Sequence, residues 1–152
     1  MTIDEQVEII QRFYTSFQKR DHAGMIACYH PQVEFYDPVF GPLEGKLVAA
    51  MWHMLCERGT DLQIQYTNVR TDGSRGQAHW EATYTFSGTG RRVHNSIDAT
   101  FDFEDGSIIR HRDEFDVWRW TRMALGSMGV LLGWSPLVQN KVRHTAAAGL
   151  HK

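Results

Sequence analysis

The first part of the chain repeats its apolar residues every three to four positions, which is the spacing of an amphipathic helix. The stripe consists of Val7, Ile10, Phe13, Tyr14 and Phe17. It predicts a helix over residues 4–19, with Asp4 as its N-terminal cap. The polar segment 20–22 ends this helix, and Asp21 can cap a short second helix that runs to about residue 29.

The next segment alternates between strand, loop and helix patterns. Residues 33–38 read as a short strand that ends at Pro38, because proline cannot donate a hydrogen bond to a sheet. Residues 40–45 contain two glycines and a proline, which is typical of a loop. Residues 46–57 predict a third helix.

Four strand-like segments follow, and turn signals rich in glycine and aspartate separate them. The segments cover residues 62–70, 76–87, 91–103 and 107–117. Helices followed by a meander of strands indicate an α+β fold. We therefore expect a curved antiparallel sheet that packs on one face against the three N-terminal helices.

Alternation within the strands predicts which side chains face those helices, because residues two apart in a strand share a face. One strand presents Ala78, Trp80, Ala82, Tyr84 and Phe86, and the next presents Ile97, Ala99, Phe101 and Phe103. In the last strand, the shared face carries Ile109, His111, Asp113 and Phe115. Small residues between large rings leave room for a ligand or for helix side chains.

His111 and Asp113 are the candidate catalytic residues of that last strand. Apolar residues on the same face favour an internal position for both side chains over one in solvent. A buried carboxylate costs on the order of several kcal/mol unless it is paired or protonated. A chain that places one inside a cavity therefore usually uses it. The alternative is a structural His–Asp pair that anchors the sheet to the helices.

Length and composition limit the class of protein. A chain of 152 residues is long enough for one domain with a substantial core. The net charge of −2 and the lack of a basic block argue against a nucleic-acid partner. The first residues carry no signal-peptide pattern, so we expect a cytoplasmic protein in which Cys28 and Cys56 are reduced and packed. Five Trp, five Tyr and eight Phe would suit a cavity for an apolar ligand.

The order of elements resembles the nuclear transport factor 2-like cone, which ketosteroid isomerases, limonene-epoxide hydrolases and SnoaL-like polyketide cyclases share. The resemblance covers about residues 4–120. Its markers are the break at Arg20-Asp21, the strand end 35–38, Gly45 before the third helix, and the closing segment 105–116. It implies a cone-shaped sheet, a small hydrophobic ligand and a homodimer through the sheet faces. The polar face with Arg110, Arg112, Glu81 and Thr83 would suit such a contact.

The resemblance to ketosteroid isomerases points to the first short strand. Their general base is the Asp of an Asp-Pro pair at this strand end, and Asp37 matches it. Their oxyanion-binding tyrosine on the first helix aligns with Phe13, one position from Tyr14. Their protonated second Asp aligns with Asp98 or, in another register, with Ala99. Alternation favours an outward Asp98.

The other two activities point to the last strand. In limonene-epoxide hydrolases an Asp of the closing strand activates water, and Asp113 matches it. The Arg and the second Asp of that triad fall at Trp80 and Ala82, which supply no charge, so we do not expect epoxide hydrolysis. The cyclases use an acid/base carboxylate in an apolar pocket, which Asp113 or Asp37 could provide.

Together these residues predict isomerase, cyclase or lyase chemistry on a hydrophobic carbonyl compound, without a cofactor. Asp37 or Asp113 would be the base, and His111, Tyr14 or Asn95 could donate to an enolate. The expected ligand-binding residues are Tyr14, Phe13, Phe17, Trp52, Trp80, Tyr84, Asn95 and Ile97. No metal is expected, because the eight histidines lack metal-ligand spacing. The alternatives are a non-catalytic ligand-binding or dimerisation module and a subunit of a larger oxygenase.

The C-terminal segment departs from the short family pattern. We assign residues 1–122 to the domain and residues 123–152 to a helical extension of it. Residues 123–138 carry no charge, but they fall short of the ~20 residues that a membrane span requires, and Pro136 interrupts them. Three uses compete for this segment: a lid over the mouth of the cone, a dimer contact and a membrane-surface helix. The first two are preferred.

Overall fold

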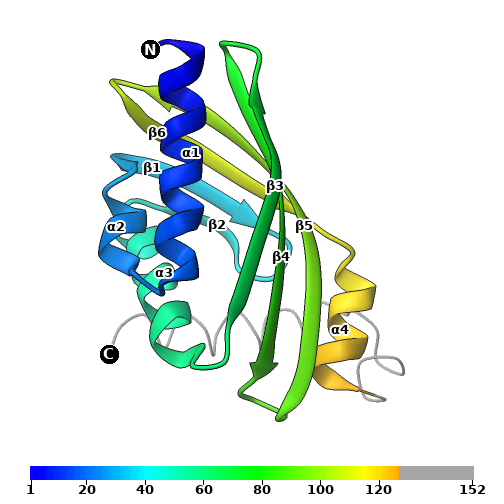
Figure 1. The fold of residues 1–152 in the computed structure, drawn as a ribbon. Coiled ribbons are helices and arrows are strands. Elements are labelled where there is room, and N and C mark those ends of the chain that lie inside the picture. Colours follow the sequence, from blue (N-terminus) through cyan, green and yellow to red (C-terminus); the bar gives the residue numbers. More distant parts are fainter. Residues whose placement is uncertain (127–152) are drawn as a thin grey trace.

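The structure is a computed structural model, and it describes residues 1–126. Within them, helices lie at Ile3–Gln18 (α1), His22–Ile26 (α2), Lys46–Arg58 (α3) and Val117–Leu125 (α4). Strands lie at Tyr29–Asp37 (β1), Gly41–Glu44 (β2), Gln63–Thr71 (β3), Arg75–Phe86 (β4), Arg91–Glu104 (β5) and Ser107–Glu114 (β6). Figure 1 shows α1 running beside β3, and α4 lying beside the start of β5.

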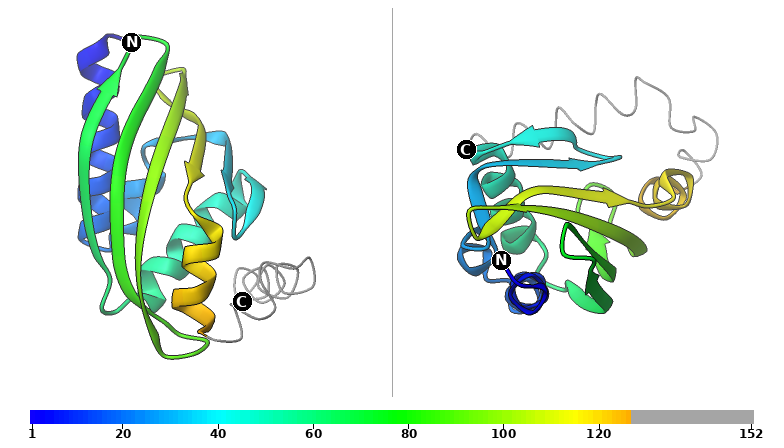
Figure 2. Two further views of the ribbon diagram at one scale, coloured as in Figure 1. Left: turned by 90° about the vertical axis from the view of Figure 1, so that its right-hand side faces the viewer. Right: turned by 90° about the horizontal axis from the view of Figure 1, so that it is seen from above.

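The strands of the described part form one curved, open sheet in the order β2-β1-β6-β5-β4-β3, and Figure 2 shows the bend of its long strands. The α+β fold class with three N-terminal helices is confirmed. One pair of strands departs from the predicted antiparallel sheet, because β1 and β6 run parallel with Phe35 opposite His111. A parallel pair needs a long connection, and α3 with β3, β4 and β5 provides it.

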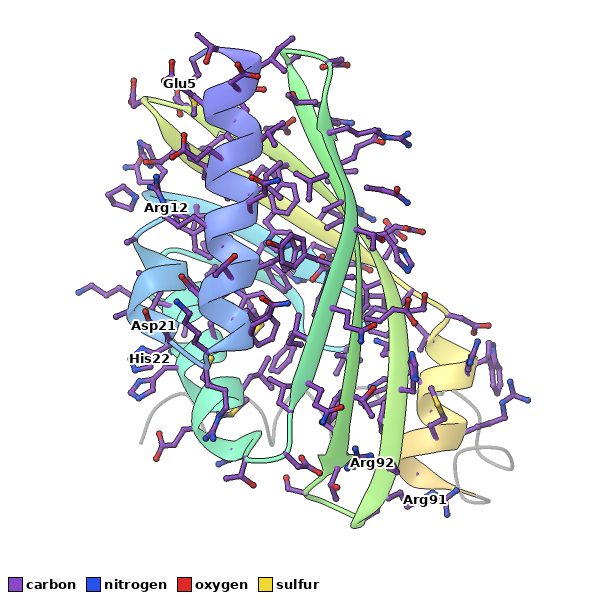
Figure 3. The ribbon with its side chains drawn as sticks, viewed as in Figure 1. Glu5, Arg12, Asp21, His22, Arg91 and Arg92 are labelled. Carbon is purple, nitrogen blue, oxygen red and sulfur yellow. The ribbon has the colours of Figure 1, made fainter. Side chains whose placement is uncertain are left out.

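Capping residues decide where the first two helices begin. Thr2 caps α1, with its Oγ1 accepting a hydrogen bond from the Glu5 amide at 3.1 Å, so the predicted cap Asp4 instead lies in the first turn. Asp21 caps α2 as predicted, accepting from the Gly24 amide at 3.0 Å. Figure 3 shows Asp21 at the corner between the two helices.

Two other boundaries differ from the sequence pattern. The loop predicted over 40–45 pairs with β1 along residues 41–44 and forms the short strand β2. Strand β6 ends at Glu114, because Asp116 caps α4 by accepting a hydrogen bond from the Arg119 amide at 3.0 Å. The first difference comes from pairing with the preceding strand and the second from a helix cap, and hydrophobic periodicity detects neither.

An aromatic core fills the space between α1, α3 and the inner face of the sheet. Its fully buried large side chains include Ile10, Phe13, Tyr14, Met51, Trp52 and Phe101. Cys28 and Cys56 form no disulfide and are buried in the same core, which matches the packed position predicted for them. A second, smaller cluster joins α4 to the sheet through Val39, Val93, Trp120 and Ala124.

Alternation in β6 is correct for the two polar residues and wrong for one apolar residue. His111 and Asp113 point inward, with 1% and 2% of their surface exposed. Ile109, predicted inward, is only partly buried, whereas Ile108 is fully buried. The cause is a β-bulge: Phe103 pairs with Ile108 and the preceding Asp102 pairs with Arg110, which leaves Ile109 as the extra residue.

The C-terminal extension predicted over 123–152 lies largely outside the described residues. Its first residues belong to the end of α4, which begins earlier than the extension, at Val117. The segment predicted to form a lid, a dimer contact or a membrane-surface helix lies outside the residues that the structure describes. In the part that is described, every helix is too short or too polar to cross a membrane.

Gly45 should be sensitive to substitution because of its backbone conformation. It precedes α3 with φ 53° and ψ −119°, a combination that a side chain strongly disfavours. We expect Gly45→Ala to lower the free energy of unfolding by about 1–3 kcal/mol in urea denaturation. Glu44→Ala, a change at the neighbouring exposed residue, is the control and should shift it by less than about 0.5 kcal/mol. Equal stability of the two variants would contradict the assigned strain.

Candidate functional site

A pocket of about 240 Å³ opens between α3, the inner face of β4, β5 and β6, and the start of α4. Most of its wall is apolar, and the apolar lining includes Phe17, Val39, Phe40, Met51, Trp52, Leu55, Leu62, Trp80, Ile97, Phe115 and Trp120. Ala82 belongs to the wall, whereas Ala99 does not. The space predicted from small residues therefore lies near Ala82, toward the α4 end of the sheet.

A few polar side chains interrupt this apolar wall. Asp37, Tyr84, Asn95 and Asp113 line the interior, while Arg58 lies in the lining at the exposed end of α3. Asn95 is largely buried, and alternation along β5 turns it inward opposite Ala82. A mostly apolar pocket with a few convergent polar groups is the usual form of a small-molecule site.

Asp113 is the most deeply buried of these polar groups. One carboxylate oxygen, Oδ1, lies 2.9 Å from His111 Nε2 and accepts a hydrogen bond from Trp80 Nε1 at 3.3 Å. The other oxygen, Oδ2, accepts no hydrogen bond from the residues that the structure describes. Because Asp113 lines the pocket, Oδ2 is the oxygen that can meet a ligand.

His111 lies behind Asp113 and packs among aromatic rings. The centroids of Phe13, Phe35 and Phe101 lie 5.4, 5.1 and 4.5 Å from that of the imidazole. Its Nδ1 lies 2.8 Å from the hydroxyl oxygen of Tyr29. The imidazole is thus hydrogen-bonded at both nitrogens and stands outside the pocket wall.

Tyr29 is a residue that the sequence analysis missed. Its hydroxyl also accepts a hydrogen bond from Trp52 Nε1 at 2.9 Å, so it joins α3 to β6. The strand was predicted to begin at residue 33, which left Tyr29 outside the sheet. In the structure Tyr29 opens β1 opposite Ile108, and the β1–β6 register then shifts before Glu34. Only the parallel pairing could have revealed it.

The structure brings most of the predicted site residues together at the pocket. Those in its lining are Asp37, Asp113, Phe17, Trp52, Trp80, Tyr84, Asn95 and Ile97. Phe13, Tyr14 and His111 are not in the lining but stand behind it in the core. Trp52 and Trp80 separate them from the pocket, since Phe13 packs on Trp52 at 5.6 Å and Tyr14 on Trp80 at 5.9 Å between ring centroids.

Asp37 is engaged in a turn at the end of β1. Its Oδ1 accepts hydrogen bonds from the backbone amides of Val39 and Phe40, at 2.9 and 2.6 Å. This is the geometry of an Asx turn. Asp98 is exposed on the outer face and pairs with His79 at 2.9 Å, so the outward prediction is confirmed.

The pKa values of the tyrosine hydroxyls near the site are raised, which favours their protonated forms. Burial raises the pKa of Tyr84 to about 12, with a further increase from the charge of Asp37 and a decrease from the hydrogen bond of Trp120. Burial also raises the pKa of Tyr14 well above its ordinary value, and the negative charge of Asp113 adds to the effect. Tyr84 accepts from Trp120 Nε1 at 2.9 Å, which leaves its own hydrogen for an acceptor in the pocket.

Metal binding finds no support in the arrangement of side chains. Across residues 1–126, no three His, Cys, Asp or Glu side chains are grouped so that they could hold one ion. The polar groups that the pocket lining does supply include the buried carboxylate of Asp113, the amide of Asn95 and the phenol of Tyr84.

Residues 10–111 match the model of the SnoaL-like domain. The chain belongs to the SnoaL-like family. A comparison of the sequence with curated proteins finds no match. The fold of this SnoaL-like protein is the nuclear transport factor 2-like cone, as the resemblance implied.

Solved structures share this fold at low sequence identity. An epoxide hydrolase of M. tuberculosis, similar to limonene-epoxide hydrolase, has 18% identity over 86% of this chain and 97% of its own, with a TM-score of 0.66. TerC, co-crystallised with polyporic acid, has 19% identity over 78% and 97%, also at 0.66. A nuclear transport factor 2-like protein of unknown function from Burkholderia pseudomallei has 20% identity over 81% and 98%, at 0.68.

Removing the hydroxyl of Tyr14 should stabilise this SnoaL-like protein. The hydroxyl is fully buried and has no hydrogen-bond partner among the described residues, and such a group costs free energy. We expect Tyr14→Phe to raise the free energy of unfolding by about 1 kcal/mol and the melting temperature by about 2–4 °C. Tyr66→Phe is the control, because its hydroxyl is hydrogen-bonded to Thr15 at 3.2 Å and its loss should not stabilise. Destabilisation by Tyr14→Phe would show that this hydroxyl is satisfied.

The raised pKa of Tyr84 predicts a pH dependence of stability. Above pH ~10 the unfolded chain loses the Tyr84 proton, whereas the folded chain keeps it until pH about 12. Folding therefore loses stability as the pH rises through this window, by up to roughly 2–3 kcal/mol from this residue. Urea denaturation at intervals from pH ~9 to ~12 should show a steeper loss in the wild type than in Tyr84→Phe. Parallel curves would refute the assignment.

Proposed function

We propose that this chain is a small-molecule enzyme that uses Asp113 as a general base on a hydrophobic carbonyl compound. The observation that carries the proposal is a carboxylate, 2% exposed, in the lining of an apolar pocket: one oxygen lies within hydrogen-bond distance of Trp80 Nε1 and His111 Nε2, and the other accepts no hydrogen bond from the described residues. Of the two carboxylates considered, Asp113 is favoured over Asp37, because Asp113 is almost fully buried in the apolar wall whereas Asp37 is only partly buried in a turn.

The chemistry would begin with proton abstraction next to the carbonyl group. Asp113 Oδ2 takes the proton from carbon, and the electron pair of the C–H bond moves to form an enolate. An N–H of Asn95 or the hydroxyl of Tyr84 donates to the enolate oxygen. Return of the proton to another carbon gives an isomerase, attack of the enolate carbon on a second carbonyl gives a cyclase, and cleavage of a neighbouring bond gives a lyase. None of these routes requires a cofactor.

The structural neighbours are compatible with this reaction class without fixing it. The M. tuberculosis neighbour is an epoxide hydrolase, but Trp80 and Ala82 stand where the resemblance places the Arg and second Asp of that triad. TerC was co-crystallised with polyporic acid, which supports a small organic molecule as the ligand of a protein with this fold. The pocket of this chain, with its aromatic wall, supports a ligand of similar character.

The rival function is a non-catalytic module that binds a hydrophobic ligand. One observation favours it: the hydroxyl of Tyr14 is enclosed in the core instead of reaching the pocket as an oxyanion donor. A module of this kind would bind ligands equally well with or without the Asp113 charge. An enzyme would lose turnover on the same change while still binding the ligand.

From the resemblance we also infer a homodimer and a cytoplasmic location. Charged side chains that pair with one another cover the outer face of the sheet, as in the Arg110–Asp102 and Arg112–Glu114 pairs. This face is polar, as predicted for a contact between copies. Sedimentation analysis of the purified chain measures the oligomeric state directly.

Substitution of the two carboxylates separates the candidate functions. We expect Asp113→Asn to lower the rate of solvent deuterium exchange into hydrophobic ketones by about 100-fold or more, as loss of a general base does. Asp37→Asn should lower it by less than about tenfold, through the turn it stabilises. Asp98→Asn, on the exposed outer face, should leave it unchanged.

Two outcomes would remove the enzymatic proposal. Undiminished exchange in Asp113→Asn means that this carboxylate is not the base. Saturable ligand binding, followed by tryptophan fluorescence, with no exchange in the wild type and the same affinity in Asp113→Asn favours the binding module. Trp52, Trp80 and Trp120 line the pocket and would report binding in either case.

A further inference from the structure

Four buried side chains from three elements form one hydrogen-bonded series that ends at the pocket. Trp52 on α3 contacts Tyr29 at the start of β1, Tyr29 contacts His111 on β6, and His111 contacts Asp113 two residues further on. The distances are 2.9, 2.8 and 2.9 Å, and none of the four residues is more than 7% exposed. Bulk water therefore does not compete for these hydrogen bonds.

The chemistry of the first residue sets the direction of the whole series. An indole nitrogen can only donate, so the Tyr29 oxygen accepts from Trp52. The single hydrogen of the Tyr29 hydroxyl then has the lone pair of His111 Nδ1 as its partner. With Nδ1 accepting, a neutral imidazole carries its proton on Nε2 and donates it to Asp113 Oδ1.

We propose that Tyr29, oriented by Trp52, is a positioning residue that holds His111 as the neutral Nε2–H tautomer and thereby keeps Asp113 ionised with Oδ2 toward the ligand. The inference rests on the proposed function for its catalytic meaning but not for its structural content. It assigns His111 to orienting the carboxylate, because both of its nitrogens are occupied and Asp113 stands between it and the ligand.

The two competing proton arrangements are less favourable for the same residues. If His111 carried its proton on Nδ1, its Nε2 lone pair would face Asp113 Oδ1, and the acid would have to be protonated. If His111 were an imidazolium, both nitrogens would donate. In each case Nδ1–H points at the Tyr29 oxygen, so the hydroxyl hydrogen of Tyr29 is left without an acceptor in an apolar core, which is the costly situation for a buried donor.

The surroundings of the imidazole act on its charge in two opposite ways. Burial among aromatic rings from α1, α3, β1 and β5 disfavours a charged ring, whereas the carboxylate of Asp113 favours one, so the hydrogen of the Tyr29 hydroxyl decides for the neutral form. Tyr29 itself stays protonated, since burial and the charge of Asp113 raise its pKa well above the ordinary value. The hydroxyl can therefore act as the donor that the arrangement requires.

Nitrogen NMR of the intact chain tests the arrangement without any substrate. In protein with ¹⁵N-labelled histidine at neutral pH, the His111 ring, assigned by its loss in His111→Gln, should show a protonated Nε2 and an unprotonated, hydrogen-bonded Nδ1. In Tyr29→Phe, the Nδ1 signal should move to the position of a nitrogen lone pair without a donor, and the Trp52 indole N–H should exchange faster with solvent. Tyr66→Phe, a matched loss of a hydroxyl outside the series, should change neither signal.

Kinetics then test the catalytic meaning on any ketone that the wild type exchanges. Tyr29→Phe should lower kcat by about tenfold, the value of one lost hydrogen bond, with KM within about twofold because Tyr29 does not touch the ligand. Tyr66→Phe should leave both constants unchanged. A purely structural role for Tyr29 would lower the stability of the variant while leaving the His111 signals and kcat as in the wild type.

The outcomes separate this inference from the proposed function. A wild-type His111 with a protonated Nδ1, or a Nδ1 signal that Tyr29→Phe does not move, overturns the inference whatever the activity. The expected NMR pattern in a protein that exchanges no ketone sustains the positioning of Asp113 by Tyr29 and refutes the enzymatic proposal instead. A rise in KM with unchanged kcat in Tyr29→Phe also overturns the catalytic part.

Discussion

A carboxylate buried among aromatic rings is stable only where N–H groups donate hydrogen bonds to it. In β6, Asp113 has two such donors. His111 and Trp80 both donate to Oδ1, so the charge is compensated on one side while the other side remains accessible. The donors are themselves fixed, because Trp80 lies in the middle of β4 and His111 is held from behind by Tyr29. The surrounding rings exclude water and hold these groups in place.

This requirement explains how the interior is divided. Toward α1 the core is closed, with Phe13, Tyr14 and Phe101 packed edge to face. Toward α4 the wall includes Ala82 and Asn95, and the pocket opens there. The closed part supplies rigidity to the acid, and the open part supplies space for a ligand. Asp113 lies at the boundary between them, which is where a base can be both buried and reachable.

The sequence was sufficient for the parts of the fold that depend on local patterns. Periodicity predicted the three N-terminal helices and the long strands, and alternation predicted that His111 and Asp113 point inward. The prediction failed where the pairing between strands decides the structure. The bulge at Ile109 depends on the register with β5, and the role of Tyr29 depends on the parallel contact between β1 and β6. The placement of Phe13 and Tyr14 behind the pocket depends on the positions of Trp52 and Trp80, which no spacing along the chain encodes.

The bulge in β6 has a consequence for how this chain can vary. The bulge adds one unpaired residue, Ile109, between the hairpin tip and His111. The inward and outward positions of β6 therefore alternate in one phase before the bulge and in the opposite phase after it. A one-residue insertion or deletion at the tip can be taken up by creating or removing such a bulge, so the acid keeps its orientation. A one-residue insertion or deletion between His111 and Asp113 cannot be compensated in this way, and it would turn the Asp113 side chain to the outer face. Indels in relatives with an inward acid should therefore cluster on the hairpin side of Ile109.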